Sequence, residues 1–421
     1  MKKTEVEIPK SYAGFLTVNA TLDNHLFFWF FPSQERKDAP LLIWLSGGPG
    51  ISSLVGAFGE NGPLQPRTPP PGTDAKDVAG KFEARSGSWL GPFSLLYIDN
   101  PVGTGYSHSS SGPRITQEGY GQDLYECVEQ FYKLFPAQLS NDLYVGGQSY
   151  AGKYVPVLAH LIHTALVENR TDIPLRGIYI GGPLFAPEIM FPANFEYIYN
   201  MGVISKYTRD TWRNATQAIV DEYLAGKINS RTAVNGILHM VFDTYAPYFD
   251  NYVFMKQMDY MTITDIMRSD RIRAAVHVGN LHYVAESKKV FEQLLPDIIT
   301  STIDKLAELL DADRYKVLIF SGDFDMIITV PMIDQGLMAM SWRRQVEYKH
   351  ETRKMWYKPK PCNSDCPLYG YFSLTGPLCH VVVHGAGHMV PRDQLEISRE
   401  MMLQFVQNGC INDSISHTPQ K

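Results

Sequence analysis

Short apolar runs alternate along this chain with longer segments that have helical periodicity. Several of the runs lack polar alternation, which is typical of strands buried on both faces of a parallel sheet. The strand-like runs lie at residues 25–31, 41–45, 95–98, 143–145, 177–180, 317–320 and 380–384. Residues 120–134 and 153–167 carry apolar side chains at helical spacing. Strands that alternate with helices predict an α/β fold with a doubly wound, mostly parallel sheet.

Two segments interrupt this alternation. Residues 66–80 contain three consecutive prolines and several Gly and Asp residues, which predicts a surface loop. Residues 184–265 have no strong strand signal and are rich in aromatic, Met and helix-forming residues. We expect a helical insertion there, at a usual site for a cap over a pocket. The prediction is therefore a single domain over residues 1–421 with a helical cap at 184–265, followed by a polar, disordered tail after Cys410.

Composition narrows the class of protein. The chain has 421 residues, of which 44% are hydrophobic and 19% charged, so it can bury a large core. Its net charge of −6 and the lack of a Lys/Arg cluster argue against a nucleic-acid partner. No apolar stretch is long enough to span a bilayer, and the N-terminus lacks the apolar segment of a signal peptide. Glycosylation sequons begin at Asn19, Asn169, Asn214 and Asn412, and they favour a secreted glycoprotein.

The cysteines allow a disulfide but give little support to a metal site. There are five of them: Cys127, Cys362, Cys366, Cys379 and Cys410. An odd number leaves at least one without a partner in the chain. The close spacing of Cys362, Cys366 and Cys379 permits one local disulfide. A zinc site would need these three with His380, but the spacing is not that of a zinc ribbon, so no metal is predicted.

Three motifs follow strand-like runs in the order Ser, Asp, His. They occupy residues 146–152, 321–325 and 385–391, and this order is that of α/β-hydrolases. Ser149 lies between a predicted strand and a predicted helix, with the small residues Gly147 and Ala151 two positions away on either side. A lone serine at this place would be interpreted as a helix N-cap. The two distant partners favour a nucleophile instead.

Each partner of Ser149 has a rival nearby. Asp325 follows the predicted strand at 317–320 by a short loop, but Asp323 is only two residues away. His388 closes a glycine-rich turn, where a base would have access to a hydroxyl. His384 belongs to the preceding apolar run, so we expect it to have a core or supporting role. Jointly, the motifs predict a triad of Ser149, His388 and either Asp325 or Asp323.

A glycine-rich turn upstream completes the candidate chemistry. Residues 44–50 (Trp-Leu-Ser-Gly-Gly-Pro-Gly) leave a predicted strand. Glycines in such a turn let backbone N–H groups approach a reacting carbonyl. We predict an oxyanion hole formed by the N–H groups of Gly48 and Tyr150. The alternative is an ordinary strand-to-helix loop.

These motifs resemble those of the serine carboxypeptidase family. The matching stretches are residues 45–53, 60–63, 97–107, 147–156 and 387–391. Residues 4–19 are similar to the vitellogenic-like carboxypeptidase branch in particular. The resemblance implies an α/β-hydrolase fold and selects Asp325 over Asp323. It also implies release of C-terminal amino acids from peptides or proteins through an acyl-enzyme on Ser149, without a cofactor, and a lysosomal or extracellular place in the secretory pathway.

The resemblance also identifies a site for the free carboxylate of the substrate, and there this chain departs from the family. Gly47 and Glu60 match the family pattern, whereas Ser46 replaces an Asn and Gln148 replaces the Glu before the nucleophile. Gln has the shape of a protonated Glu with a permanent donor, so it can bind a carboxylate without a shared proton. These departures leave two alternatives open: an esterase or acyltransferase on the same triad, and a non-catalytic carboxypeptidase-like binding or protective protein.

Overall fold

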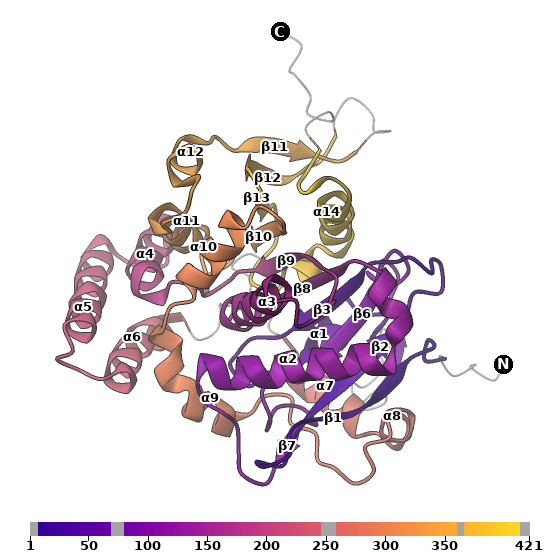
Figure 1. The fold of residues 1–421 in the computed structure, drawn as a ribbon. Coiled ribbons are helices and arrows are strands. Elements are labelled where there is room, and N and C mark those ends of the chain that lie inside the picture. Colours follow the sequence, from indigo (N-terminus) through magenta and orange to yellow (C-terminus); the bar gives the residue numbers. More distant parts are fainter. Residues whose placement is uncertain (1–6, 69–79, 246–257, 360–365, 413–421) are drawn as a thin grey trace. The chain divides into compact units, whose positions relative to one another are not determined.

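The computed structural model describes residues 7–68, 80–245, 258–359 and 366–412 (Figure 1). The chain divides into two compact units, and each of them contains segments from distant parts of the sequence. The first unit consists of Met1–Gly147, Leu161–Leu175 and Met258–Gln293. The second consists of Gln148–His160, Arg176–Gln257 and Leu294–Lys421.

The first unit contains strands in the order β1-β2-β6-β3-β8, with β7 paired to β2. Their bounds are β1 (Tyr12–Asn19), β2 (Asn24–Phe31), β3 (Leu41–Leu45), β6 (Ser94–Ile98), β7 (His108–Ser109) and β8 (Leu143–Gln148). The strand β3 is parallel to both β6 and β8, with Ile43 opposite Leu96 and Val145. β1, β2 and β6 pair antiparallel. A separate two-stranded sheet joins β4 (Leu64–Pro66) to β5 (Phe82–Ala84).

Helices in the first unit include α1 (Ser53–Gly59), α2 (Gln117–Leu134), α7 (Tyr260–Arg268), α8 (Asp270–Ala275) and α9 (Lys288–Leu294). Of these, α1 packs against β3 and β6, and α2 packs against β1. α2 begins where the Thr116 side chain accepts the Gly119 N–H, and its face toward the sheet is apolar. Phe131 on that face packs edge to face on Phe28 and Phe30 of β2. The aromatic contact fixes α2 against the sheet.

The second unit contains strands in the order β9-β10-β13-β12-β11. They are β9 (Leu175–Gly181), β10 (Lys316–Gly322), β11 (Lys354–Tyr357), β12 (Leu368–Thr375) and β13 (Leu378–Val383). β10 is parallel to β9 and β13, with Ile319 opposite Ile180 and His380, whereas β12 is antiparallel to both of its neighbours. The carboxyl ends of β9, β10 and β13 therefore lie at one edge, where ligands commonly bind in open α/β sheets.

The remaining helices begin or lie in the second unit. They are α3 (Ala151–Val167), α4 (Pro187–Asn200), α5 (Lys206–Leu224), α6 (Ser230–Tyr245), α10 (Ile303–Asp311), α11 (Val330–Ala339), α12 (Gln345–His350), α13 (Val390–Asp393) and α14 (Leu395–Asn408). α4 packs against both α5 and α11, and α5 packs against α6 (Figure 1). No described helix is long and apolar enough to cross a membrane.

The expected elements are present. The seven predicted strands correspond to β2, β3, β6, β8, β9, β10 and β13, and the two predicted helices to α2 and α3. The α/β class with a mostly parallel central arrangement is confirmed. α4, α5, α6 and the start of α7 fall within residues 184–265. Their role as a cap stays a prediction, and residues 69–79 of the expected loop and the tail 413–421 lie outside the described residues.

Of the three cysteines whose spacing permits one local disulfide, Cys379 is not part of it. Cys379 on β13 pairs with Cys410 after α14, with a Cα–Cα distance of 5.3 Å. The two meet because α14 packs along β10 and β13. Cys366 is also disulfide-bonded, and Cys362 lies outside the described residues. Cys127 is a buried free thiol, which confirms the expected unpaired cysteine.

Candidate active site

Ser149 occupies a sharp turn between β8 and α3. β8 ends one residue before Ser149 and α3 begins two residues after it. The serine has φ of +62°, a left-handed conformation that is uncommon outside glycine and often found at functional turns. Its N–H donates to Gly181 O at 2.8 Å, and its carbonyl accepts N–H groups from Gly152 at 2.9 Å and Leu184 at 3.1 Å. These bonds fix the backbone, and the side chain is only half-buried.

Asp325 and His388 meet at the carboxyl edge of β10 and β13. His388 Nδ1 lies 2.8 Å from Asp325 Oδ2. The other carboxylate oxygen accepts the N–H groups of Ile327 at 2.8 Å and Ile328 at 3.0 Å. Asp325 is 1% exposed and His388 4%. Because Nδ1 faces the carboxylate, the opposite nitrogen of the ring, Nε2, is directed away from Asp325.

A glycine turn connects Ser149 to this pair. The Ser149 N–H bonds to Gly181 at the end of β9, and the next residue is Gly182. A Cβ added to Gly182 would lie 3.0 Å from Asp325 Oδ2 and 3.2 Å from His388 Nδ1. Gly181 and Gly182, at the end of β9, thus lie close to all three residues of the predicted triad.

The two rival residues pair with each other. Asp323 Oδ2 lies 2.7 Å from His384 Nδ1, and Asp323 Oδ1 accepts the Gly385 N–H at 2.8 Å. The His384 side chain is 51% exposed, so the core role is wrong, and the supporting role, the other expected alternative, stays a prediction. β13 ends at Val383, and His384 already belongs to the turn that follows. The second pair is more exposed than the first, and it is the Asp325–His388 pair that adjoins Gly182.

A segment that sequence reasoning missed holds the start of α3. Residues 297–302 contact the first residues after Ser149 through three side chains. The contacts are Tyr150 Oη to Asp297, Lys153 Nζ to Thr300 O, and Thr302 Oγ1 to Gly152 O. Burial lowers the pKa of Lys153 to about 8, against the opposing charges of Asp297 and Glu188. No local pattern in 297–302 could have identified this role.

In the first unit, the predicted oxyanion and carboxylate loop follows β3. The Ser46 N–H donates to Ser53 Oγ at 3.1 Å, and Gly47 O accepts the Ile51 N–H at 3.2 Å. Gly48 has φ of +105°, and a Cβ there would lie 2.9 Å from the nitrogens of Gly50 and Ile51. Only glycine suits that position. Ser46 is 3% exposed, so the loop is almost fully buried at this residue.

A buried aspartate directly after β6 anchors this loop. Asp99 Oδ1 accepts the Ser52 hydroxyl at 2.6 Å and the Ser53 N–H at 2.9 Å, and Asp99 Oδ2 accepts the Tyr106 N–H at 3.0 Å. Burial raises the pKa of Asp99 to about 6, and these hydrogen bonds oppose the rise. Sequence analysis placed Asp99 within a family motif but gave it no role.

Glu60 caps the end of α1 and is 1% exposed. Near it lies Arg85, which sequence analysis did not single out. Burial lowers the pKa of Arg85, and the nearby Tyr97 and Glu60 oppose this effect.

The predicted site residues are divided between the two units. The first unit contains Ser46, Gly47, Gly48 and Glu60. The second contains Gln148, Ser149, Tyr150, Asp325 and His388. Gln148 is the last residue of β8 and is 5% exposed.

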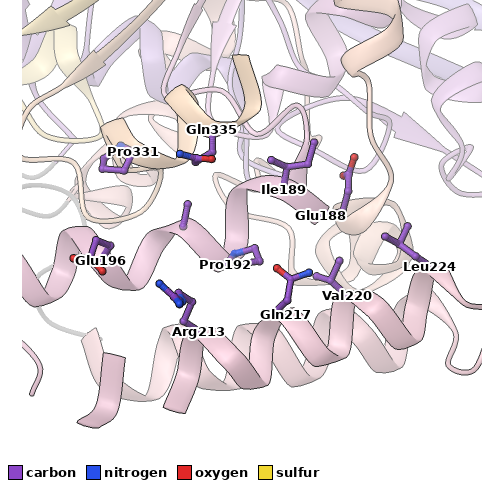
Figure 2. Close-up of a pocket in the computed structure, with 11 residues that line it drawn as sticks. Glu188, Ile189, Pro192, Glu196, Arg213, Gln217, Val220, Leu224, Pro331 and Gln335 are labelled. Atoms are coloured by element: carbon purple, nitrogen blue, oxygen red, sulfur yellow. The ribbon is translucent and has the colours of Figure 1, made fainter. Parts of the chain in front are cut away.

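A cavity of about 720 Å³ lies in the second unit between α4, α5 and α11 (Figure 2). Pro192, Val220 and Leu224 give it an apolar lining, and Glu188 and Arg213 add charges. Burial raises the pKa of Glu188, while hydrogen bonds and the charge of Lys153 oppose this rise. The lining does not include any member of the predicted triad.

Comparison with known proteins shows the family of the chain. The family model described as serine carboxypeptidase matches residues 2–408. The chain belongs to the serine carboxypeptidase family. A venom serine carboxypeptidase of Apis mellifera is 35% identical over 96% of this chain and 86% of its own length. A vitellogenic carboxypeptidase of Aedes aegypti is 32% identical over 94% of this chain and 79% of its own length, which agrees with the resemblance to that branch.

A solved structure supports the fold. The chain resembles a prohormone-processing carboxypeptidase from Saccharomyces cerevisiae with a TM-score of 0.81, at 21% identity, over 95% of this chain and 92% of the other. The serine carboxypeptidase described here therefore has the α/β-hydrolase fold, as expected. Its enzyme class is that of a serine-type carboxypeptidase, a hydrolase. These findings favour a peptidase over an esterase, an acyltransferase or a non-catalytic relative.

Proposed function

We propose that this carboxypeptidase releases C-terminal amino acids from peptides and proteins with Ser149 as nucleophile, His388 as base and Asp325 as its partner. The observation that supports the assignment best is the buried Asp325–His388 contact of 2.8 Å beside the glycine turn that binds the Ser149 N–H. Nucleophile, base and orienting acid are the arrangement that acyl transfer requires.

The reaction proceeds in two halves. Ser149 Oγ attacks the carbon of the last peptide carbonyl while His388 Nε2 takes the hydroxyl proton. As the tetrahedral intermediate collapses, the C–N bond breaks and the same proton passes to the departing amino acid. Water then attacks the acyl-enzyme, again with His388 as base, and Ser149 is restored. Asp325 holds Nδ1–H and stabilises the imidazolium, because its second oxygen is kept in place by two backbone N–H groups.

The backbone N–H groups of Gly48 and Tyr150 are assigned to the oxyanion. Gly48 occupies a position in its turn that only glycine suits, and Tyr150 is anchored through its hydroxyl to Asp297. Donors that are fixed before the reaction stabilise developing charge without a cost of reorganisation.

Ser46, Gly47, Glu60 and Gln148 are assigned to the free carboxylate of the substrate. Each of the side chains is almost fully buried, so hydrogen bonds made there are stronger than in water. The Gln148 amide donates at every pH, whereas a Glu would donate only when protonated.

The proposed compartment is the secretory pathway, with a lysosomal or extracellular destination. The Cys379–Cys410 disulfide is of a kind that persists in oxidising compartments. The sequon residues Asn169, Asn214 and Asn412 are exposed and accessible to a glycosyltransferase. A venom protein and a vitellogenic protein are among the relatives.

A direct test compares a blocked dipeptide with its C-terminal amide from about pH 4.5 to 7.5, with Ser149→Ala as control. We expect hydrolysis of the free acid, a much slower reaction of the amide, and loss of both in the Ser149→Ala variant. Turnover that persists without the hydroxyl would contradict the nucleophile assignment. A preference for amide or ester substrates would contradict the carboxylate site and favour an esterase or acyltransferase.

A further inference from the structure

Two backbone hydrogen bonds join the loops that carry Asp325 and His388. The Asp323 N–H donates to Val383 O at 3.1 Å, and the Phe324 N–H donates to Ala386 O at 2.8 Å. Just beyond these bonds the triad pair forms, between Asp325, one residue after Phe324, and His388, two residues after Ala386. Close approach begins at Gly322, where an added Cβ would lie 2.1 Å from Ala386 O. A shift of one loop must therefore shift the other, and with it the catalytic imidazole.

The Asp323 carboxylate adds side-chain contacts between the same two loops. One oxygen accepts the Gly385 N–H at 2.8 Å and the other contacts His384 Nδ1 at 2.7 Å. Its backbone carbonyl accepts the hydroxyl of Tyr197 from α4. Asp323 is thus bound to the turn that leads to His388 through two consecutive residues, and to α4 through a third.

The charge state of Asp323 determines how strongly its carboxylate accepts hydrogen bonds from Gly385 and His384. Burial raises its pKa, whereas the hydrogen bond and charge of His384 lower it. A protonated carboxyl is a poorer acceptor and could not hold both N–H donors as well as a carboxylate does. Loss of His384 would therefore let Asp323 take up a proton at a higher pH.

Few other titratable groups surround this pair among the described contacts. Tyr197 of α4 reaches the Asp323 carbonyl, and Tyr369 of β12 accepts the His384 N–H through its backbone oxygen. Asp393 of α13 accepts the Gly387 N–H at 2.8 Å. The remaining neighbour is the Asp325–His388 pair, which the same two loops carry. In this set, the charge that acts on Asp323 is that of His384.

We propose that Asp323 and His384 form a second Asp–His pair that positions the catalytic histidine, and that His384 keeps this support in place at acid pH. The proposal rests on the triad proposed above. Neither residue takes part in the chemistry: His384 is half-exposed and contacts Asp323, so both act as positioning residues through the loop to His388.

The test is the pH dependence of kcat/KM for a free-acid dipeptide in His384→Phe. We expect a value close to wild type near neutral pH and an acid limb that moves upward by about half to one pH unit. At acid pH this corresponds to a loss of about three- to tenfold. His384→Arg keeps a cation and donor beside Asp323, and it should restore the wild-type acid limb.

Asp323→Asn provides a second, nearly isosteric variant. It imitates the protonated carboxyl, so kcat/KM should fall at every pH, and adding His384→Phe should no longer move the acid limb. The matched control is His160→Phe, which removes a His160–Glu308 contact of 2.6 Å in the same unit but away from these loops. Its pH profile should equal that of the wild type.

The outcomes separate this proposal from the triad. Full activity of the Ser149→Ala variant would contradict the proposed triad, whatever the result for His384→Phe. An inactive Ser149→Ala together with unchanged profiles for His384→Phe and Asp323→Asn would overturn only the positioning pair. The rate at which an organophosphonate labels Ser149 supplies a second readout, and it should fall in His384→Phe at acid pH in parallel with kcat/KM.

Discussion

Gln148 is the residue whose chemistry separates this chain most clearly from the family pattern. It lies directly before Ser149 at the end of β8 and is nearly buried. Gln148→Glu would place there a carboxyl whose pKa burial raises, so that it donates a hydrogen bond only in acid. We expect kcat/KM for a free-acid peptide to match wild type near about pH 5 and to fall more steeply above it, by up to about tenfold per pH unit.

The matched control for this prediction is Gln148→Met, which has a similar shape and no donor. It should lower kcat/KM by a similar factor at every pH, leaving the slope unchanged. Equal pH profiles of kcat/KM for Gln148→Glu and the wild type would show that this position does not bind the free carboxylate of the substrate.

At the residue scale, the sequence predicted those site residues that lie in a recognisable local turn. Ser149 and His388 lie in turns with small neighbours, which a short motif records. Asp297 and Arg85 act through contacts with segments far away in the chain, and nothing beside them in the sequence marks those contacts. The pairing of Asp323 with His384 was hidden for the same reason, although both residues were recognised as rivals of the triad.

At the scale of elements, the junction of β10 and β13 depends on Gly322. A methyl group at this residue would lie 2.1 Å from the backbone oxygen of Ala386, which cannot move without separating the two loops. We expect Gly322→Ala to lower the free energy of unfolding by about 2 kcal/mol or more and to reduce kcat/KM at every pH. Thermal unfolding and the rate of Ser149 labelling by an organophosphonate measure the two effects.

Gly14→Ala on β1 serves as its control. There the nearest atom to an added Cβ belongs to the Phe28 ring, at 3.8 Å, and the change should cost less than about 0.5 kcal/mol. Similar stability losses in both variants would show that the close approach at Gly322 is not the cause.

Apolar runs predicted the buried strands and missed the edges. β1, β11 and β12 mix exposed and buried positions and pair antiparallel, so their sequences lack a continuous apolar run. The Cys379–Cys410 bridge was beyond sequence reasoning because 31 residues separate the two cysteines, and α14 brings them together. Elements whose position depends on tertiary packing leave a weak local signal.

Across the whole molecule, two buried groups give stability opposite pH dependences. Burial lowers the pKa of His380 to about 4 from its ordinary 6.5, with Asp334 opposing. Between these values the unfolded chain binds a proton that the folded protein does not, so stability falls as the pH drops from about 6.5 toward 4. Burial raises the pKa of Asp99 from 3.8 to about 6. There the folded protein holds the extra proton, so stability rises as the pH falls from about 6 toward 3.8.

Between about pH 7 and 4.5 each group changes the free energy of unfolding by about 2 kcal/mol, with opposite signs, so the two nearly cancel. His380→Asn keeps an acceptor near the Tyr348 hydroxyl but removes the titration. Relative to wild type, this variant should gain about 2 kcal/mol of stability at pH 4.5 compared with pH 7. Asp99→Asn should lose about the same amount over the same interval. Urea unfolding at both pH values measures these differences, and a shift of the same sign in the two variants would contradict the cancellation. In the free energy of unfolding, the proton that the buried Asp99 holds in acid is expected to offset the proton that the buried His380 does not bind.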